Sequence, residues 1–302
     1  MNNPHDKLFK ATFSHPEVVA SLIEDLFPSE LSRHLQLDSL VLTTNSYIDD
    51  ELNEHFADLV YDCAFDDGIT IQIALLLEHK SYVVAEPHLQ LLRYLGNRWQ
   101  QDSEHRRKLT PIIPVIIYHG TDAWQQQPFA SSLVGTNSLL QTFFPEFDYV
   151  LINLTALKEE QIFAFRNRFL ALSAALMKHR QDKRFDEYVR QNIRPLMQGL
   201  ADNELAGVVI PTFLYLLETT RLTGDDIVLI FSTVSKQTEE AAMNGIEKLH
   251  QEGWLKGHAE TARKFIKGAL KLGMDAKTIA DTFEMDIAEV SAIIEKIRQE
   301  KA

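Results

Sequence analysis

Two carboxylates and a lysine lie in two neighbouring segments that have the composition of β-strands. Asp58 lies near the start of the segment Phe56–Phe65, and Glu78 and Lys80 lie at the end of the segment Ile69–His79. Because side chains alternate between the two faces of a strand, Glu78 and Lys80 project from the same face. We therefore expect a small acidic site with an ammonium group beside it.

The turn between these segments, Asp66-Asp67-Gly68, predicts how the two strands pair. Asp-Gly between two apolar runs is a strong signal for a β-hairpin. A hairpin centred on Asp67 pairs residues whose numbers sum to about 134 or 135, so Asp58 lies opposite residues 76–77 and beside Glu78. The pattern predicts that both carboxylates and the lysine converge at one end of the sheet.

This grouping suits the metal-assisted hydrolysis of phosphodiester bonds. Asp58 and Glu78 offer the oxygen ligands that Mg²⁺ prefers, and the backbone carbonyl of His79 could add another. A bound divalent cation polarises the phosphoryl oxygen and lowers the pKa of a bound water, which would be the nucleophile. Lys80 could orient or deprotonate that water and offset negative charge in the transition state.

The alternative interpretation is a surface salt bridge between Glu78 and Lys80, which is a common pair on a strand face. Three features favour the catalytic interpretation. The pair ends an otherwise apolar strand, where charge is expensive unless it is paired or used. Asp58 lies in a strand, where aspartate is disfavoured. The predicted hairpin also brings Asp58, Glu78 and Lys80 to the same end of the sheet.

The composition excludes several classes of protein. The chain has 302 residues and a formal net charge of −13, from 30 Lys and Arg against 43 Asp and Glu. A chain this acidic does not bind nucleic acid by its overall charge, so contact with DNA needs a local basic patch or a metal ion. The single cysteine, Cys63, excludes an intramolecular disulfide and a multi-thiolate metal site. Since the apolar runs are too short to cross a bilayer, we expect a soluble cytoplasmic protein without membrane contact.

Residues 1–155 mix helix and strand signals. Besides the two hairpin strands, the sequence predicts strands at Ser39–Ile48, Pro111–Tyr118 and Phe147–Asn153, with a helix over Glu86–Glu104. Pro111–Tyr118 is almost wholly apolar, which is typical of a strand buried on both faces beneath helices. The predicted fold class is α/β, with a PD-(D/E)xK-like αβββαβ core around a mixed sheet.

The C-terminal half is predicted to be all helical. Residues 156–240 form a helical region that packs on or follows the core, beginning with a helix over Glu159–His179. Residues 241–302 form a helical tail, in which Asp275–Phe283 and Asp286–Arg298 resemble two helices joined by a tight turn. This is the shape of a helix-turn-helix, but acidic residues would open the reading helix and repel DNA phosphates. A plain helical hairpin is the alternative.

Six pieces of the sequence follow one another in an order that resembles a known family. They are Pro4–Lys10 (PHDKLFK), Ser46-Tyr47-Ile48, Ala57–Tyr61 (ADLVY), Glu78–Ser81 (EHKS), Arg93-Tyr94 and Ile113–Gly120 (IPVIIYHG). An aspartate, about twenty residues, and then Glu-x-Lys is a spacing that resembles the PD-(D/E)xK nuclease superfamily. More specifically, the pieces resemble the Rpn family of recombination-promoting nucleases, also described as transposases, over roughly residues 4 to 155.

The resemblance implies a divalent-metal-dependent DNA endonuclease, linked to recombination or mobile-element activity. Carried over residue by residue, Asp58 and Glu78 would be metal ligands and Lys80 the catalytic lysine, with Mg²⁺ or another divalent cation as cofactor. Many Rpn members have glutamine at the position of Lys80. Lysine is the residue of the wider superfamily there, which argues for an intact site. Cutting both DNA strands would need two sites, which a homodimer could supply.

Seven further residues could support this site. Asp6 lies early in the first helix, where an acidic residue often assists the metal in this superfamily; a favourable charge at a helix N-terminus is the alternative. For the others, the alternatives are structural roles in the sheet, the core or a turn. They are Asp62, Gln72, Gln90, Arg93, Tyr94 and His119.

The densest basic run, His105–Lys108, is a candidate contact for the DNA backbone through Arg106, Arg107 and Lys108. A solvated helix end is the alternative for this run. Two other functions stay open. One is a catalytically inactive protein that has a nuclease fold and a DNA-binding or regulatory role. The other is a nuclease for RNA or for a particular nucleic-acid structure, because the same chemistry serves any phosphodiester.

Overall fold

The computed structural model divides the chain into two compact units, Met1–Ala242 and Met243–Ala302. In the first unit it describes residues 4–43, 56–66, 68–78, 86–133, 140, 142–200 and 205–242. In the second it describes residues 243–247, 266–267, 270, 275–283, 287, 290–291 and 293–295. The side chains of residues 56–58, 132, 205–206 and 281–283 lie outside this description.

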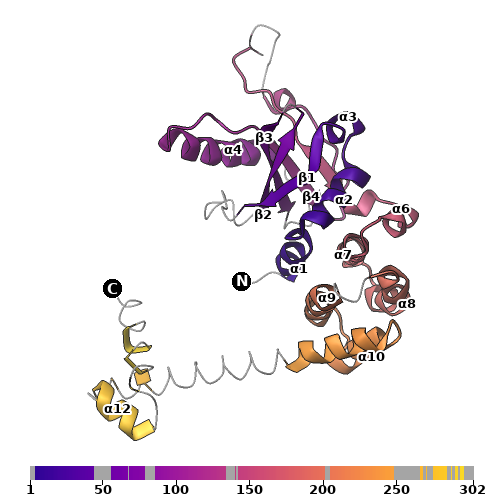
Figure 1. Ribbon diagram of the computed structural model, residues 1–302, viewed down its shortest axis with the longest axis vertical. Coiled ribbons are helices and arrows are strands. Elements are labelled where there is room, and N and C mark those ends of the chain that lie inside the picture. Colours follow the sequence, from indigo (N-terminus) through magenta and orange to yellow (C-terminus); the bar gives the residue numbers. More distant parts are fainter. Residues whose placement is uncertain are drawn as a thin grey trace. The chain divides into compact units, whose positions relative to one another are not determined.

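The first unit is built on a five-stranded mixed sheet (Figure 1). Its strands are hydrogen-bonded in sequence order, β1-β2-β3-β4-β5. The pairs β1–β2 and β2–β3 are antiparallel, and the pairs β3–β4 and β4–β5 are parallel. The bounds are β1 Leu35–Leu42, β2 Phe56–Phe65, β3 Ile69–Glu78, β4 Ile112–Tyr118 and β5 Val150–Asn153.

The antiparallel hairpin of β2 and β3 follows from its turn residues. Asp66 and Gly68 have positive φ values of 37° and 84°, a region that glycine enters without strain. The parallel pair of β3 and β4 instead needs a crossover, because the last residue of β3 and the first residue of β4 lie at opposite ends of the sheet. Helix α4, Pro87–Glu104, supplies that crossover. The predicted hairpin and the predicted mixed sheet are therefore confirmed.

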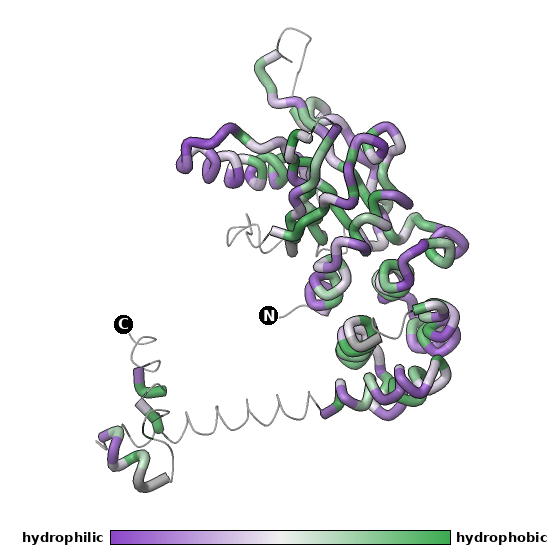
Figure 2. The backbone as a smooth tube through the Cα atoms, viewed as in Figure 1, coloured by the Kyte–Doolittle hydropathy of each residue, from purple (hydrophilic) through white to green (hydrophobic). Residues whose placement is uncertain are grey.

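Helices cover both faces of the sheet (Figure 1). On one face, α4 places Leu91 and Tyr94 in a buried cluster with Val60, Leu76 and Ile116 of the strands. On the other face lie α1, Pro4–Phe13, and α2, Pro16–Leu26, and the Tyr61 hydroxyl donates a hydrogen bond of 2.7 Å to the carbonyl of Phe13. The central strands are correspondingly apolar along most of their length (Figure 2).

Beyond Asn153, the described residues form helices and turns only. Several polar contacts join these helices to α1: the hydroxyls of Thr12 and Ser173 lie 2.6 Å apart in the core, and Lys7 Nζ lies 2.6 Å from Glu218 Oε1. This helical region therefore packs on the N-terminal helices of the core. Its helices include α6 Glu159–Ala164, α7 Arg168–His179, α8 Phe185–Met197, α9 Leu205–Thr219 and α10 Gly224–Ser232, and a further helix begins at residue 236.

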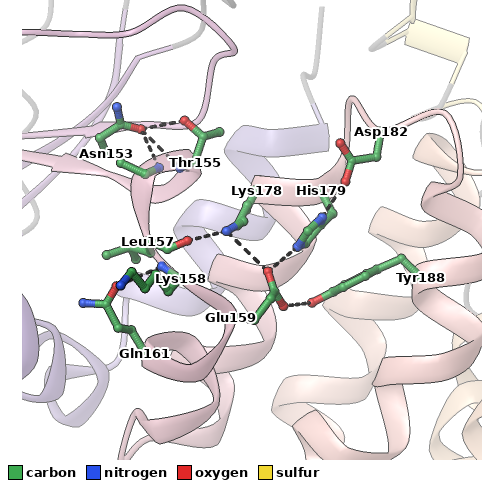
Figure 3. A network of polar contacts seen from close by, with 11 residues as sticks. Asn153, Thr155, Leu157, Lys158, Glu159, Gln161, Lys178, His179, Asp182 and Tyr188 are labelled. Atoms are coloured by element: carbon green, nitrogen blue, oxygen red, sulfur yellow. Dashed lines mark hydrogen bonds and ion pairs between the residues drawn. The ribbon is translucent and has the colours of Figure 1, made fainter.

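A polar network joins α6, α7 and α8 (Figure 3). The carboxylate of Glu159 contacts His179 Nε2 at 2.6 Å, the Tyr188 hydroxyl at 3.0 Å and Lys178 Nζ at 3.3 Å. The rings of His179 and Tyr188 stack with their centroids 3.9 Å apart. His179 Nδ1 lies 2.5 Å from a carboxylate oxygen of Asp182. One carboxylate thus ties three helices together.

Three predicted elements have different bounds in the structure, and one of them is the strand predicted over Phe147–Asn153, which is the shorter Val150–Asn153. The first strand is Leu35–Leu42 rather than Ser39–Ile48, and residues 44–48 lie outside the described part of the chain. The helix predicted over Glu159–His179 is interrupted between α6 and α7. Phe165 is extended with a ψ of 134°, and the side chain of Asn167 accepts a hydrogen bond from the Leu170 amide to begin a new helix. The short helix α3, Ser29–Ser32, was not predicted from the sequence.

The second unit contains α12, Ala276–Phe283, where a helix was predicted. Asp275 precedes it and accepts a hydrogen bond of 2.8 Å from the Thr278 amide, which satisfies one of the open donors at the helix start. A small buried cluster holds the unit together, formed by Ile266, Ile279, Ala280, Val290 and Ile294. In neither unit does a described helix have the length and apolar character that spanning a membrane requires.

Candidate functional site

Glu78 ends β3 as a fully buried carboxylate, with 0% of its surface exposed. Because β3 and β4 are parallel and Leu77 pairs with Ile117, Glu78 lies at the same end of the sheet as Tyr118 and His119. Ligands of open α/β sheets bind beyond the carboxyl ends of the strands. This end of β3 and β4, which we call the carboxyl end, is therefore the candidate site.

The register of the hairpin confirms the position predicted for Asp58. Asp58 pairs with Leu76, and Phe56 pairs with Glu78, so the paired residue numbers sum to 134. Residues 58 and 78 therefore occupy positions two residues apart on the same face of the sheet. The side chain of Asp58, like His79 and Lys80 entirely, lies outside the described residues.

Burial and nearby charge both act on Tyr118, which ends β4 next to Glu78. Burial raises the pKa of the Tyr118 phenol, and the carboxylates of Asp122 and Glu78 raise that pKa further. The phenol therefore stays protonated at neutral pH. The effect of Glu78 on the pKa of Tyr118 agrees with the pairing of β3 and β4, which places the two residues side by side.

The first turn of α1 brings a histidine to the same end of the sheet. The ring of His5 lies against that of His119, with centroids 4.5 Å apart, and His119 is only 4% exposed. On its other side, His5 Nδ1 lies 3.2 Å from the hydroxyl of Tyr215 on α9. Burial raises the pKa of Tyr215 far above its usual range, so the phenol stays protonated while it shares this hydrogen bond with His5 Nδ1.

His5 lies at the carboxyl end of the sheet, and sequence reasoning did not single it out. It lies within the family-like piece Pro4–Lys10, and that position was the one available signal. Asp6, the next residue, is partly buried in the first turn of α1. The structure thus brings the start of α1 to the carboxyl end of the sheet, where Glu78 and His119 lie.

Asp62 and Gln72 lie far from Glu78 along the strands. Gln72 is six residues before Glu78 on β3, which corresponds to about 20 Å of strand. Its amide donates a hydrogen bond of 2.9 Å to Asp62 Oδ1 and accepts one of 2.9 Å from Arg98 Nε. The structure therefore places this pair in a buried polar network between the sheet and α4, apart from the candidate site.

Asp102 completes that network. Its side chain is 1% exposed, forms an ion pair with Arg98 and accepts hydrogen bonds from the amide and the hydroxyl of Thr110 at 2.9 and 2.8 Å. Burial by itself would raise the pKa of Asp102, but the hydrogen bonds from Arg98 and Thr110 outweigh burial and hold that pKa below its usual value. The network fixes the C-terminal part of α4 against the sheet.

The three candidates on α4 have different surroundings. Tyr94 is fully buried in the cluster with Leu91 and Ile116, Gln90 is half-buried, and Arg93 is exposed. Gln90 and Tyr94 are one helical turn apart, whereas Gln72 and Arg98 mark the opposite end of the helix–sheet contact. Gln90 is thus nearer to the start of α4 and to the carboxyl end of β3 than the buried network is.

The basic run Arg106, Arg107 and Lys108 forms and follows the C-terminal cap of α4. Arg106 has a φ of +54°, its amide donates to the Ser103 carbonyl at 2.9 Å, and the Arg107 amide donates to the Asp102 carbonyl at 2.8 Å. These are the two hydrogen bonds of a Schellman motif, with arginine where glycine is usual. Arg107 Nε also lies 3.3 Å from Asp102 Oδ1, and Lys108 is exposed.

The one described carboxylate of the predicted pair, Glu78, is a group of the type that binds a hard divalent cation. Mg²⁺ is usually bound by one or two carboxylates, with water and substrate phosphates as its other ligands. Glu78 is a buried carboxylate at the carboxyl end, and the register puts position 58 beside it. Among the residues with described side chains, no three His, Cys, Asp or Glu side chains gather as a metal site. The expected ligands Asp58 and His79 lie outside that set.

Comparisons with known proteins agree with the resemblance seen in the sequence. The family model described as "Putative transposase, YhgA-like" matches residues 3–206. The chain is 23% identical over 299 residues to the "Inactive recombination-promoting nuclease-like protein RpnE" of Escherichia coli (strain K12), covering 96% of this chain and 97% of that protein. It is 25% identical over 268 residues to the "Recombination-promoting nuclease RpnD" of Escherichia coli O157:H7, covering 83% and 95%.

A third relative is the "Recombination-promoting nuclease RpnA" of Escherichia coli (strain K12), 25% identical over 264 residues and covering 83% of this chain and 85% of that protein. No solved structure matches this chain. The family model matches more than half of the chain, and these relatives align along most of their length. The chain therefore belongs to the YhgA-like transposase family, together with the Rpn proteins.

Proposed function

We propose that this protein is a divalent-metal-dependent DNA endonuclease that acts in recombination or in mobile-element activity. Two relatives that align over most of this chain are named recombination-promoting nucleases. The observation that carries the proposal is the buried Glu78 at the carboxyl end of β3, with Asp58 two positions away on the same face. A carboxylate this buried is costly unless it is paired or used.

The order of elements supports a PD-(D/E)xK-like core. Helices α1 to α3 precede three antiparallel strands, and α4 then leads to β4 in parallel beside β3. Asp58 and Glu78 belong to adjacent strands of the hairpin, and Glu-x-Lys follows directly at residues 78–80. In this arrangement both carboxylates come from rigid strands, which hold catalytic groups more precisely than loops do.

Each residue of the proposed site would have a defined task. Asp58, Glu78 and the carbonyl of His79 would hold Mg²⁺, which when bound polarises the phosphoryl oxygen and provides an activated water. Lys80 would orient the attacking water and offset the negative charge that develops on the phosphate. His119 and Asp6 would help to order the carboxyl end around these groups.

Plasmid cleavage tests this proposal. Supercoiled plasmid would be incubated with the purified protein and Mg²⁺, with and without EDTA, beside Asp58→Asn, Glu78→Gln and Lys80→Ala. Asp62→Asn is the matched control, because Asp62 lies on the same strand but binds Gln72 instead. We expect nicking or linearisation that EDTA and the three site variants abolish and that Asp62→Asn keeps. Equal cleavage by all proteins would contradict the site.

A second candidate is a nuclease fold without activity that binds DNA. The observation in its favour is that the relative aligned over 96% of this chain is named inactive. Saturable DNA binding by a wild-type protein that cuts no plasmid in Mg²⁺ or Mn²⁺ would select this candidate. A panel of duplex DNA, single-stranded DNA and RNA substrates would distinguish the DNA endonuclease and the inactive DNA-binding protein from an RNA- or structure-specific nuclease.

A further inference from the structure

A polar cavity of about 410 Å³ lies where the connection between α7 and α8 meets the end of α9. Three basic residues line it, Arg180, Lys183 and Arg221, together with three carboxylates. Three cations and three carboxylates would make the cavity neutral if all six side chains were equally available to a ligand. The contacts of these groups show that they do not.

Each of the three carboxylates is engaged by another group. Asp182 lies 2.5 Å from His179 Nδ1, as Figure 3 shows, and Glu218 lies 2.6 Å from Lys7 Nζ. Asp186 Oδ1 accepts a hydrogen bond of 3.5 Å from the Arg221 backbone amide. The acidic side of the cavity is therefore largely satisfied by the protein.

The three basic side chains differ in this respect. None of Arg180, Lys183 and Arg221 forms an ion pair with a carboxylate in the part of the chain that the structure describes. The guanidinium carbon of Arg180 lies 6.0 Å from the ring centroid of Phe185, and its buried Nε has no hydrogen-bond partner there. The cavity of this acidic chain therefore holds three cations that no described carboxylate pairs with directly, although Asp182, Asp186 and Glu218 line the same space.

The cavity neighbours the candidate site along α9. Thr219, which lines the cavity, lies one helical turn, or about 6 Å, from Tyr215. Tyr215 carries the hydroxyl that contacts His5, and the charge of Arg180 partly opposes the rise in the pKa of Tyr215 that burial causes. The ion pair of Lys7 and Glu218 makes a second connection between α1 and the cavity.

We propose that this cavity binds a backbone phosphate of the nucleic-acid substrate, a few nucleotides from the scissile bond. Arg180, Lys183 and Arg221 would be the contacts, because guanidinium and ammonium groups are the usual partners of phosphate. The assignment rests on the proposed function for the identity of the substrate. It explains how an acidic chain holds a polyanion beside its active site, since a few local contacts suffice where overall charge repels.

The salt dependence of DNA binding tests the assignment. Binding of a fluorescent duplex would be measured by anisotropy in EDTA, over a series of salt concentrations, for Lys183→Ala combined with Arg221→Ala. The matched control combines Arg184→Ala with Arg166→Ala, which also removes two exposed cations but ones that pair with Glu187 and Glu24. Thermal unfolding of both double variants checks that they fold.

We expect the slope of log affinity against log salt to become shallower by about two units in the cavity variant, one for each lost phosphate contact. Affinity at low salt should fall by about tenfold or more, with little change in the control. Equal slopes in wild type and cavity variant would overturn the assignment. Calorimetric binding of inorganic phosphate that Lys183→Ala with Arg221→Ala abolishes, without a change in the DNA slope, would overturn it in favour of a small anion.

These outcomes are distinct from a failure of the proposed nuclease function. The anisotropy experiment contains no divalent metal and no cleavage. If the slope changes as expected but wild-type protein cuts no plasmid, the phosphate site stands and the catalytic proposal fails. If plasmid is cut but both double variants bind DNA like wild type, the catalytic proposal stands and the phosphate site is overturned.

Discussion

The imidazole of His5 lies against that of His119 in a tilted arrangement, with ring centroids 4.5 Å apart, although the two residues come from the first helix and from the end of the fourth strand. Tyr215 of the helical region holds His5 from the other side through a hydrogen bond of 3.2 Å. The helical region is thus more than an appendage, because one of its helices positions a residue at the carboxyl end of the sheet.

Removing the Tyr215 hydroxyl tests this link. In Tyr215→Phe the ring remains but the hydrogen bond between the Tyr215 hydroxyl and His5 Nδ1 is lost, so we expect a loss of about 1 kcal/mol in the free energy of unfolding. Urea unfolding measures this loss, and NMR of the histidine ring reports whether the surroundings of His5 change. Unchanged stability and an unchanged ring spectrum would contradict a positioning role for Tyr215.

The buried network around Asp102 should be costly to break. Asp102→Ala leaves Arg98 as a buried cation without its carboxylate, and breaking a buried ion pair typically costs about 3–5 kcal/mol. We expect a fall of that size in the free energy of unfolding, measured by denaturant titration. Asp122→Ala, at an exposed position, is the control and should change stability little. Similar losses in both variants would argue against the network.

Arg106 offers a substitution that should stabilise the protein. Its φ of +54° strains any residue with a Cβ, and the position is the C-cap place where glycine is preferred. Arg106→Gly should therefore raise the free energy of unfolding by up to about 1 kcal/mol. Lys108→Gly, two residues along, should not stabilise. If Arg106→Gly also leaves the salt slope of DNA binding unchanged, Arg106 acts as a cap and not as a phosphate contact.

Stability at low pH should depend on Glu159. Burial alone would raise the pKa of Glu159, but hydrogen bonds from His179 and Tyr188, together with Lys178, outweigh it and lower that pKa from its ordinary value of 4.5. A carboxyl whose pKa is lower in the folded state contributes stability above its unfolded pKa and loses it as pH falls through the folded value. We therefore expect a stability loss below about pH 4.5 that depends on Glu159.

The measurement for Glu159 is the urea midpoint as a function of pH. Glu159→Gln should be less stable than wild type at pH 7 and should show a smaller further loss on acidification. Glu160→Gln, the exposed neighbour in the same helical turn, should follow the wild-type profile. Identical profiles for all three proteins would show that the network in Figure 3 carries no pH-dependent stability.

Local chemistry determined the hairpin and with it the place of the carboxylates. The turn residues Asp66-Asp67-Gly68 fix the pairing of β2 and β3, and a fixed register decides which residues share a face, so Asp58 opposite residue 76 was predictable. The apolar run before Tyr118 predicted a strand buried on both faces, because such strands are almost continuously apolar and do not alternate.

Local signals were weaker where elements begin and end. The first strand begins at Leu35 rather than Ser39, and the helix expected from Glu159 breaks at Phe165. The first segment is a strand and the second is helical, as predicted, but the residues at which they begin and end depend on contacts with other parts of the chain. Ser39 donates to the carbonyl of Gln36 and accepts from the Ala64 amide, and Asn167 caps α7, which no periodicity shows.

Contacts between residues far apart in the sequence were decided by the tertiary structure alone. Asp62 and Gln72 share the face of Glu78 by period, yet Arg98 of α4 draws Gln72 into a buried network at the other end of the sheet. His5 meets His119, and Arg180 lies beside Arg221, only because α1, α7 and α9 pack together. The sequence by itself determined the strand register and the carboxylate pair, because turn chemistry and side-chain alternation act over a few residues. The packing of helices on the sheet determined what surrounds that pair, because burial free energy is non-directional and is settled by the whole fold.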